Sequence, residues 1–152
     1  SPTGFLTSDL NSEINYQLRK WNKQKQLGRV LESSGGFKLP NSAIRSPDAA
    51  FVSSKSAGDI DEALKKKFAP VCPDFVIELK SESDTNKRLK EKMQEWITNG
   101  CRLAWLIDPE AEKVYIYRED GSLQEVNGFD NKLSGEAVLP GFELDLRELK
   151  VK

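Results

Sequence analysis

Three side chains on two neighbouring apolar segments have the types needed to hydrolyse a phosphodiester bond. Glu78 and Lys80 lie in PDFVIELKSESD (residues 73–84), and Asp48 lies in SPDAAFVS (residues 46–53). Side chains of a β-strand alternate between its faces, so Glu78 and Lys80 would share one face, about 6 to 7 Å apart. If Asp48 points to the same side, its carboxylate can join that of Glu78 to hold a divalent cation. Lys80 would then reach an attacking water or the scissile phosphate.

Mg²⁺ is the cation that these ligands favour, with Mn²⁺ as an alternative. Phosphodiester hydrolysis needs a hard cation that neutralises developing charge and lowers the pKa of water, and Mg²⁺ prefers oxygen ligands and keeps several waters. The chain contains no histidine, which excludes a Ser-His-Asp triad, a histidine general base and histidine metal ligands. Chemistry in this chain would therefore rest on carboxylates, lysines and metal ions.

Three further polar side chains are candidates for the same site. Glu13, at the edge of the apolar face of a predicted first helix, could bring another acid to the cluster. Gln94, beside the buried stripe of a predicted second helix, could contact a water or a phosphate. Asp74 lies on the Glu78 side of its strand, but it follows Pro73 at the start of that strand. We therefore rank Asp74 as a secondary candidate that could serve only to cap or orient.

A solvated strand face is the alternative explanation of the Glu-x-Lys triplet. Acid and lysine often alternate on a strand with one face in water, and such a triplet also arises by chance. Against this, the segment is followed by a predicted helix and a further strand, so both of its faces should be covered. Charged residues on a covered strand are costly unless they are paired or bound to a metal. Their presence on this strand therefore indicates a role.

Hydrophobic periodicity predicts the elements that would position these residues. A first helix is expected over residues 8–26 and a second from residue 84 or 85 to about residue 98, each with apolar residues at helical spacing. Strands are expected in two short pieces within residues 28–40, and then at 46–53, 73–81, 101–108, 113–118 and 123–126, with a last extended segment after Gly141. Residues 56–69 are expected to form a loop with a short helix.

The order of these elements predicts one α/β domain. Strand, helix and strand follow one another over residues 73–108, which is a βαβ crossover with parallel strands. A chain of 152 residues is long enough to bury one sizeable core, and neither an internal repeat nor a linker interrupts it. Trp21, Trp96 and Trp105 are expected in this core rather than on a base-stacking surface.

The charge balance limits how the chain could hold nucleic acid. Its 23 basic and 24 acidic residues give a net charge of −1, so no global positive field is available. Contact with DNA would need local basic clusters, and three are present: Arg19 to Lys25, Lys65 to Lys67, and Lys87 to Lys92. Each of these runs is more often a solvated helix face than a phosphate track. Their convergence on one rim would favour the phosphate-binding reading.

The cysteines and the lack of long apolar runs indicate a cytoplasmic protein. Cys72 and Cys101 match neither a zinc nor a redox spacing, and we expect both to be reduced core residues. The sequence has no apolar segment of 18 residues and no signal-peptide pattern, so we expect neither membrane insertion nor secretion.

An ordered series of motifs resembles the Uma family of predicted restriction endonucleases, which is abundant in cyanobacteria. The motifs are SPTG, SPDAAFV, PDFVIELKSESD, LKEKMQEWITNG, RLAWLIDPE, VYIYR and LPGFELDL, and they span nearly the whole chain. The resemblance implies the PD-(D/E)XK nuclease fold, a restriction-endonuclease-like central mixed β-sheet flanked by helices. It makes Asp48 the catalytic aspartate and Glu78-Leu79-Lys80 the (D/E)XK triplet. The first-helix acid of that superfamily would correspond to Glu13.

The resemblance also defines what remains open. Relatives usually carry a helix and a strand before SPTG, so we expect the leading N-terminal segment to be missing from this single nuclease-like domain over residues 1–152. Many relatives lack a lysine at the position of Lys80, and its presence here favours a competent site. The leading hypothesis is a Mg²⁺-dependent DNA endonuclease, which in this class often works as a homodimer. The alternative is an inactive nuclease-fold module that binds nucleic acid or a protein partner.

Overall fold

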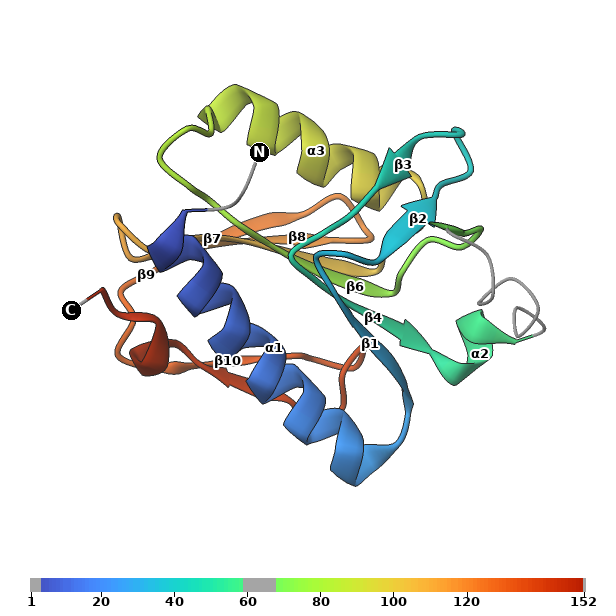
Figure 1. Cartoon of the computed structure of the whole chain (residues 1–152), viewed down its shortest axis with the longest axis horizontal. Coiled ribbons are helices and arrows are strands. Elements are labelled where there is room, and N and C mark those ends of the chain that lie inside the picture. The colour runs from blue at the N-terminus through green and yellow to red at the C-terminus, as the bar shows by residue number, and fades with distance from the viewer. Residues whose placement is uncertain (1–3, 59–67, 152) are drawn as a thin grey trace.

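A six-stranded mixed sheet forms the centre of the computed structural model, which describes residues 4–58 and 68–151 (Figure 1). Its strands lie in the order β1-β4-β6-β7-β8-β9. They are β1 (Gly28–Glu32), β4 (Ala49–Ser53), β6 (Phe75–Leu79), β7 (Leu103–Asp108), β8 (Lys113–Arg118) and β9 (Leu123–Asn127). The β6–β7 pair is parallel and its neighbours pair antiparallel. The predicted mixed sheet and its parallel crossover are therefore confirmed.

Two helices cover the opposite faces of this sheet (Figure 1). Helix α1 (Phe5–Lys25) packs Leu10, Ile14, Leu18 and Trp21 into a core that also holds Phe75, Ile77 and Leu79 of β6. Helix α3 (Asn86–Thr98) packs Leu89, Met93 and Trp96 into a second core with Val76 of β6. Strand β6 is thus covered on both faces, as its apolar sequence predicts. The three tryptophans are buried, which confirms their assignment to the core.

Helix α3 has an identifiable beginning and end. The side chain of Thr85 accepts a hydrogen bond from the backbone N–H of Arg88 (3.3 Å), so Thr85 is the N-cap. Asp84, the other predicted cap, instead accepts from the backbone N–H and hydroxyl of Ser81. The helix closes at Asn99, and Gly100 follows at φ +113°, a conformation that favours glycine.

Short elements complete the fold and include differences from the predicted boundaries. A three-stranded sheet contains β2 (Gly36–Lys38), β3 (Ile44–Arg45) and β5 (Phe68–Ala69), and a hairpin contains β10 (Lys132–Ser134) and β11 (Glu143–Asp145). Helix α2 (Ser54–Ala57) begins directly after β4, earlier than the short helix predicted within 56–69, and residues 59–67 lie outside the described part of the chain. A 3-10 helix, η2 (Leu146–Leu149), ends the fold. Helix α1 begins at Phe5, three residues before its predicted start.

Two remaining expectations concern the membrane and the cysteines. Across residues 4–58 and 68–151, the helices are too short or too polar to cross a bilayer. Both cysteines are free thiols: Cys101 is buried and Cys72 is half-buried. Burial raises the pKa of the Cys72 thiol to about 12.

Candidate active site

The register between β4 and β6 places Asp48 beside Glu78. Ala49 pairs with Ile77 in the antiparallel ladder, so Asp48, the residue before β4, meets the last residues of β6. The backbone N–H of Leu79 donates to Asp48 Oδ2 (2.7 Å), and the backbone N–H of Asp48 donates to Glu78 Oε1 (3.4 Å). Two acids that are 30 positions apart in the chain are thereby held together at one end of the sheet.

Both carboxylates line one cavity of about 620 Å³. Its walls come from the first turn of α1, the ends of β4 and β6, the loop of residues 81–84, and Leu89 and Lys92 of α3. Asp48 is half-buried, and Glu78 is only 2% exposed. The predicted pair of acids therefore faces a common space that solvent can enter.

Helix α3 supplies the partners of the Glu78 carboxylate. The indole Nε1 of Trp96 donates to Glu78 Oε2 (3.1 Å), and Lys92 Nζ lies 3.0 Å from the same oxygen. Burial raises the pKa of Glu78, while the positive charge of Lys92 opposes that rise and the negative charge of Asp48 adds to it. From sequence, Lys92 is predicted only as a member of the basic run Lys87 to Lys92 and not as a partner of Glu78. The sequence feature that could have identified it is its spacing of four residues from Trp96, which puts both side chains on one helix face.

Helix α1 supplies side-chain partners to Asp48. Asn11 Nδ2 donates to Asp48 Oδ1 (3.3 Å), and Asn15 Nδ2 donates to the backbone carbonyl of Asp48 (3.1 Å). Burial raises the pKa of Asp48, and the hydrogen bond from Leu79 opposes that rise. The side-chain oxygens of Asn11 and Asn15 are buried and have no hydrogen-bond partner within the part of the chain that the structure describes. These two asparagines, one turn apart, were also missed from sequence.

Lys80 lies outside the cavity that holds the two acids. Its Nζ donates to Asn86 Oδ1 (2.8 Å) and lies 3.8 Å from Asp108 Oδ2. It lines an adjacent cavity of about 680 Å³, which shares the wall formed by Leu6, Thr7, Ser81, Glu82 and Asp84. The pairing of Leu79 with Ile107 brings Lys80 level with Asp108 at the end of β7, and this carboxylate attracts its amine. The predicted convergence of Lys80 with Asp48 and Glu78 in one pocket is therefore not seen.

Glu13 and Gln94 also point away from the two acids. The carboxylate of Glu13 accepts a hydrogen bond from Gln17 Nε2 (3.0 Å) and lines a different cavity, with Lys20 and Asp145. Gln94 is exposed on α3. Each lies two residues from a side chain that does reach the site, Asn11 in α1 and Lys92 in α3. Two residues turn a helix by about 200°, which sends the side chain to the opposite side.

The two acids fit a divalent cation of the Mg²⁺ type. Asp48 Oδ1 and Glu78 Oε1 have only long contacts, at 3.3 and 3.4 Å, so each keeps lone pairs free toward a ligand. Mg²⁺ is commonly held by one or two carboxylates and keeps several waters. In residues 4–58 and 68–151 no group of three or more His, Cys, Asp or Glu residues could hold a metal, so oxygens of water or substrate would complete the coordination.

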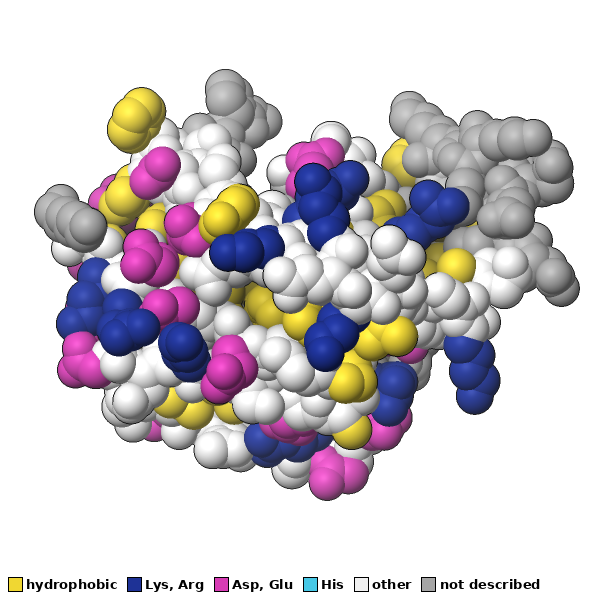
Figure 2. Space-filling view, turned by 90° about the horizontal axis from the view of Figure 1, so that it is seen from below, with side chains coloured by type: hydrophobic (Ala, Val, Ile, Leu, Met, Phe, Trp, Pro, Cys, Tyr) yellow, Lys and Arg dark blue, Asp and Glu magenta, His cyan; other side chains and the backbone are white. Residues whose placement is uncertain are grey.

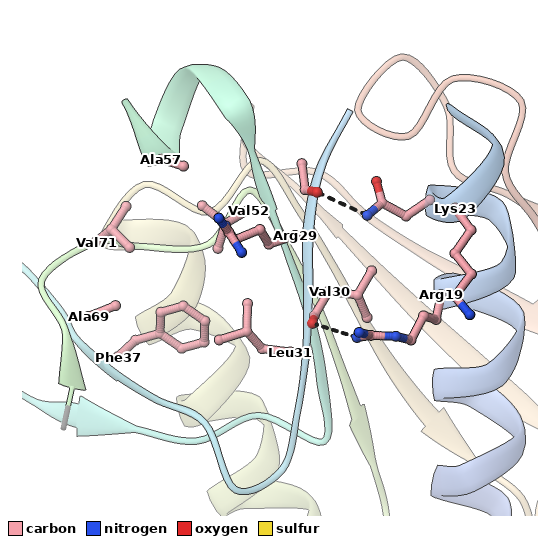
Figure 3. A pocket seen from close by; sticks show the side chains of 12 residues that line it. Arg19, Lys23, Arg29, Val30, Leu31, Phe37, Val52, Ala57, Ala69 and Val71 are labelled. Carbon is pink, nitrogen blue, oxygen red and sulfur yellow. Dashed lines mark hydrogen bonds between the residues drawn. The ribbon is translucent and has the colours of Figure 1, made fainter. Parts of the chain in front are cut away.

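The two predicted basic clusters that lie within the described residues do not converge on one rim. Arg19 and Lys23 of α1 line a separate cavity of about 430 Å³ beside the edge strand β1, where Arg19 donates to the carbonyl of Val30 (Figure 3). Arg19 lies about 18 Å along α1 from Thr7 at the acid cavity. Lys65 to Lys67 lie outside the described residues. The face in Figure 2 shows basic and acidic side chains interspersed.

The third basic cluster does border the acids. Lys92 lines their cavity, and Arg88, one turn earlier in α3, joins Lys92 in lining a neighbouring hollow. This part of the Lys87 to Lys92 run is therefore the basic surface that the described structure brings to the site.

Comparisons with known proteins identify the fold and the family. A family model, Uma2, described as "Putative restriction endonuclease", matches residues 1–147. A crystal structure from Anabaena variabilis, described as a "putative nuclease", has a TM-score of 0.83 at 18% identity, covering 97% of this chain and 81% of that one. A DrdV–DNA complex aligns with a TM-score of 0.47 at 16% identity, over 75% of this chain and 9% of that one, which is too weak to carry an argument. No curated protein matches. The chain belongs to the Uma2 family, as its motifs predicted, and shares the fold of the Anabaena protein.

Proposed function

We propose that this Uma2-family protein is a nuclease that hydrolyses DNA phosphodiester bonds with the help of Mg²⁺ or Mn²⁺. The observation that carries the proposal is the pairing of Asp48 and Glu78 at adjacent strand ends, where both residues line one cavity and each has one oxygen in only a long contact. Burying two neighbouring acids raises the pKa of both, which is a cost that a bound cation would offset.

The protein groups of the site would hold the two carboxylates still. The N–H of Leu79 fixes Asp48, and the indole of Trp96 fixes Glu78, so the pair does not have to be ordered when substrate arrives. A divalent cation bound by Asp48 and Glu78 would supply charge neutralisation at the phosphate and a more acidic water. In the hydrolysis, the water oxygen bonds to phosphorus while the bond from phosphorus to one sugar oxygen breaks. A proton leaves the water for solvent, and the departing oxygen takes one up.

DNA would approach along α3, in the cytoplasm. Arg88 and Lys92 line the hollow beside the acids, together with Asp84, Glu91 and Glu95, and these two basic side chains would contact DNA phosphates near the cut. Two copies of the chain would be needed to cut both strands in one encounter, and we propose a homodimer on that ground.

A plasmid-nicking assay tests the proposal. The wild type is expected to nick supercoiled DNA in MgCl₂ or MnCl₂ and to be inactive in EDTA. Asp48→Ala should lose at least about 100-fold of that rate, because it removes one of two ligands. Glu119→Ala is the matched control, since Glu119 is an exposed acid in the β8–β9 turn. A wild type that binds DNA but never cuts it would overturn the proposal and favour the inactive binding module.

A further inference from the structure

We propose that Lys92 of α3, rather than Lys80, supplies the amine that contacts the substrate phosphate in this site. The inference rests on the proposed function, because it assigns a residue to the phosphate that Asp48 and Glu78 would bring under attack. It differs from the sequence-based assignment, which takes the lysine from the Glu-x-Lys triplet.

The contacts of Lys92 place its amine at the acids and at the open space together. Lys92 Nζ lies 3.0 Å from Glu78 Oε2, and its side chain is 37% exposed where that of Glu78 is 3% exposed. An ammonium group has three donors, so the contact with Glu78 leaves others free toward the cavity. A phosphate oxygen entering the cavity beside Glu78 would therefore meet this amine.

Lys80 is engaged elsewhere. Its Nζ contacts Asn86 Oδ1 at 2.8 Å and Asp108 Oδ2 at 3.8 Å, and it lines the adjacent cavity. Bringing this amine to Glu78 would break both contacts. We therefore assign a structural role to Lys80, because its amine connects Asp108 at the end of β7 with Asn86, the first residue of α3.

Helix α3 gives Lys92 a fixed position despite its flexible side chain. Trp96, four residues later on the same face, is 1% exposed and donates to the same Glu78 oxygen as Lys92 approaches. Since the indole anchors that face of the helix to Glu78, the backbone at residue 92 is held at a constant distance from the acid. The amine is thus preorganised beside the position of developing negative charge.

Two measurements on the variants Lys92→Met, Lys80→Met and Lys90→Met test the assignment. Lys90 is an exposed lysine two residues before Lys92 and serves as the control for charge on α3. The first measurement is the affinity for a short DNA duplex in CaCl₂ as a function of salt. Removing a phosphate contact should lower the slope of log K against log salt by about 1 in Lys92→Met and leave it unchanged in the other two.

The second measurement is nicking in MgCl₂. Lys92→Met should lose about 100-fold in rate, while Lys80→Met and Lys90→Met keep most of it. Lys92→Arg, which keeps the charge, should retain the wild-type salt slope. If Lys92→Met does not fold because Glu78 is left unpaired, the slope is compared between Glu78→Gln and Glu78→Gln/Lys92→Met, where no buried charge remains.

The outcomes separate the two proposals. Loss of nicking in Lys80→Met with retention in Lys92→Met would overturn the Lys92 assignment and leave the nuclease proposal standing. A wild type that never nicks, together with a lower slope in Lys92→Met alone, would sink the nuclease proposal and support the phosphate contact. Equal slopes in all variants, or no DNA binding in CaCl₂, would overturn the Lys92 assignment.

Discussion

Strand β6 has a buried acid at each end, and the protein treats the two ends differently. At its start, Asp74 is 7% exposed, and its carboxylate accepts from the backbone N–H of Ser53 (2.7 Å) and the hydroxyl of Ser56 (2.9 Å). At its end, Glu78 and Asp48 sit side by side, each with one oxygen in only a long contact. Asp74 has a short donor on each of its oxygens, whereas Asp48 and Glu78 each keep one oxygen in only a long contact at a cavity.

The hydrogen-bond donors to each carboxylate oxygen distinguish a structural acid from a candidate functional acid on the same strand. A carboxylate whose oxygens both have short protein donors joins elements together, here β4, α2 and β6. Two adjacent buried carboxylates repel each other even with Lys92 beside Glu78, so a further cation at their weakly engaged oxygens would lower the cost of burying them. In the sequence, both kinds of carboxylate are simply acidic residues within an apolar segment, so the sequence alone does not distinguish them.

The largest difference between the two ends of β6 is expected when one acid at each end is replaced by a neutral residue. Asp74→Ala removes two acceptors and leaves the half-buried donors of Ser53 and Ser56 without this partner, so it should lower the free energy of unfolding by about 2 to 3 kcal/mol. Asp48→Asn keeps the shape of the side chain and the hydrogen bond from the N–H of Leu79, but it removes the negative charge. Because burial raises the pKa of the Asp48 carboxyl, the charged form is unfavourable in the folded state, and Asp48→Asn should raise the melting temperature in EDTA. Thermal unfolding in EDTA measures both. A fall of equal size in the two variants would contradict the distinction.

A third carboxylate beside Asp48 tests whether this end of β6 binds a cation. Asn11→Asp replaces a donor to Asp48 with a like charge, so in EDTA it should cost about 1 to 2 kcal/mol of stability. Added Mg²⁺ should recover that loss and raise the melting temperature more than it does for the wild type. Ser12→Asp, at the exposed neighbouring position, is the control and should show no extra response to Mg²⁺. An unchanged response in Asn11→Asp would argue against a cation at Asp48.

A further effect is expected from pH at the start of β6, where Cys72 lies beside Asp74. Burial raises the pKa of Cys72 to about 12 from an ordinary value of 9.0, and the nearby charge of Asp74 adds to that rise. The folded state therefore holds the thiol proton more tightly, so its contribution to stability is full below pH 9 and is lost as the pH rises toward 12. At pH 8.5, alkylation by iodoacetamide should be at least about 100-fold slower in the folded protein than in urea. Equal rates would show that this end is open.

The sequence was sufficient to predict the six strands of the central sheet, but not the short strands β3, β5 and β10. It also offered Asp48 as a partner of Glu78, on condition that the two side chains point to the same side. Alternation along β6 predicted that Glu78 would lie opposite Phe75, Ile77 and Leu79, and an aspartate before the neighbouring strand completed the pair. The same alternation puts Lys80 on the side of Glu78, whereas in the structure its amine contacts Asn86 and lies near Asp108. The approach to Asp108 depends on the register of β6 against β7, which local spacing does not contain.

The helical side chains needed a different kind of information. Glu13 and Gln94 were selected as polar residues at the edge of an apolar stripe, yet the stripe has two edges and only one faces the acids. Asn11 and Lys92 lie on that edge. Which edge it is depends on the docking of α1 and α3 on the sheet, a tertiary property that propensity and periodicity leave open.

Helix α1 takes part in two distant places on the molecule. Its first turn walls the acid cavity, while near its other end Asn22 and Arg19 donate to the outward carbonyls of Gly28 and Val30 on β1, the margin of the sheet. A bare margin of that kind is a template onto which strands of other molecules add. The helix therefore covers part of this margin, and a change that loosened it would expose the β1 carbonyls at the same time as it withdrew Asn11 from Asp48.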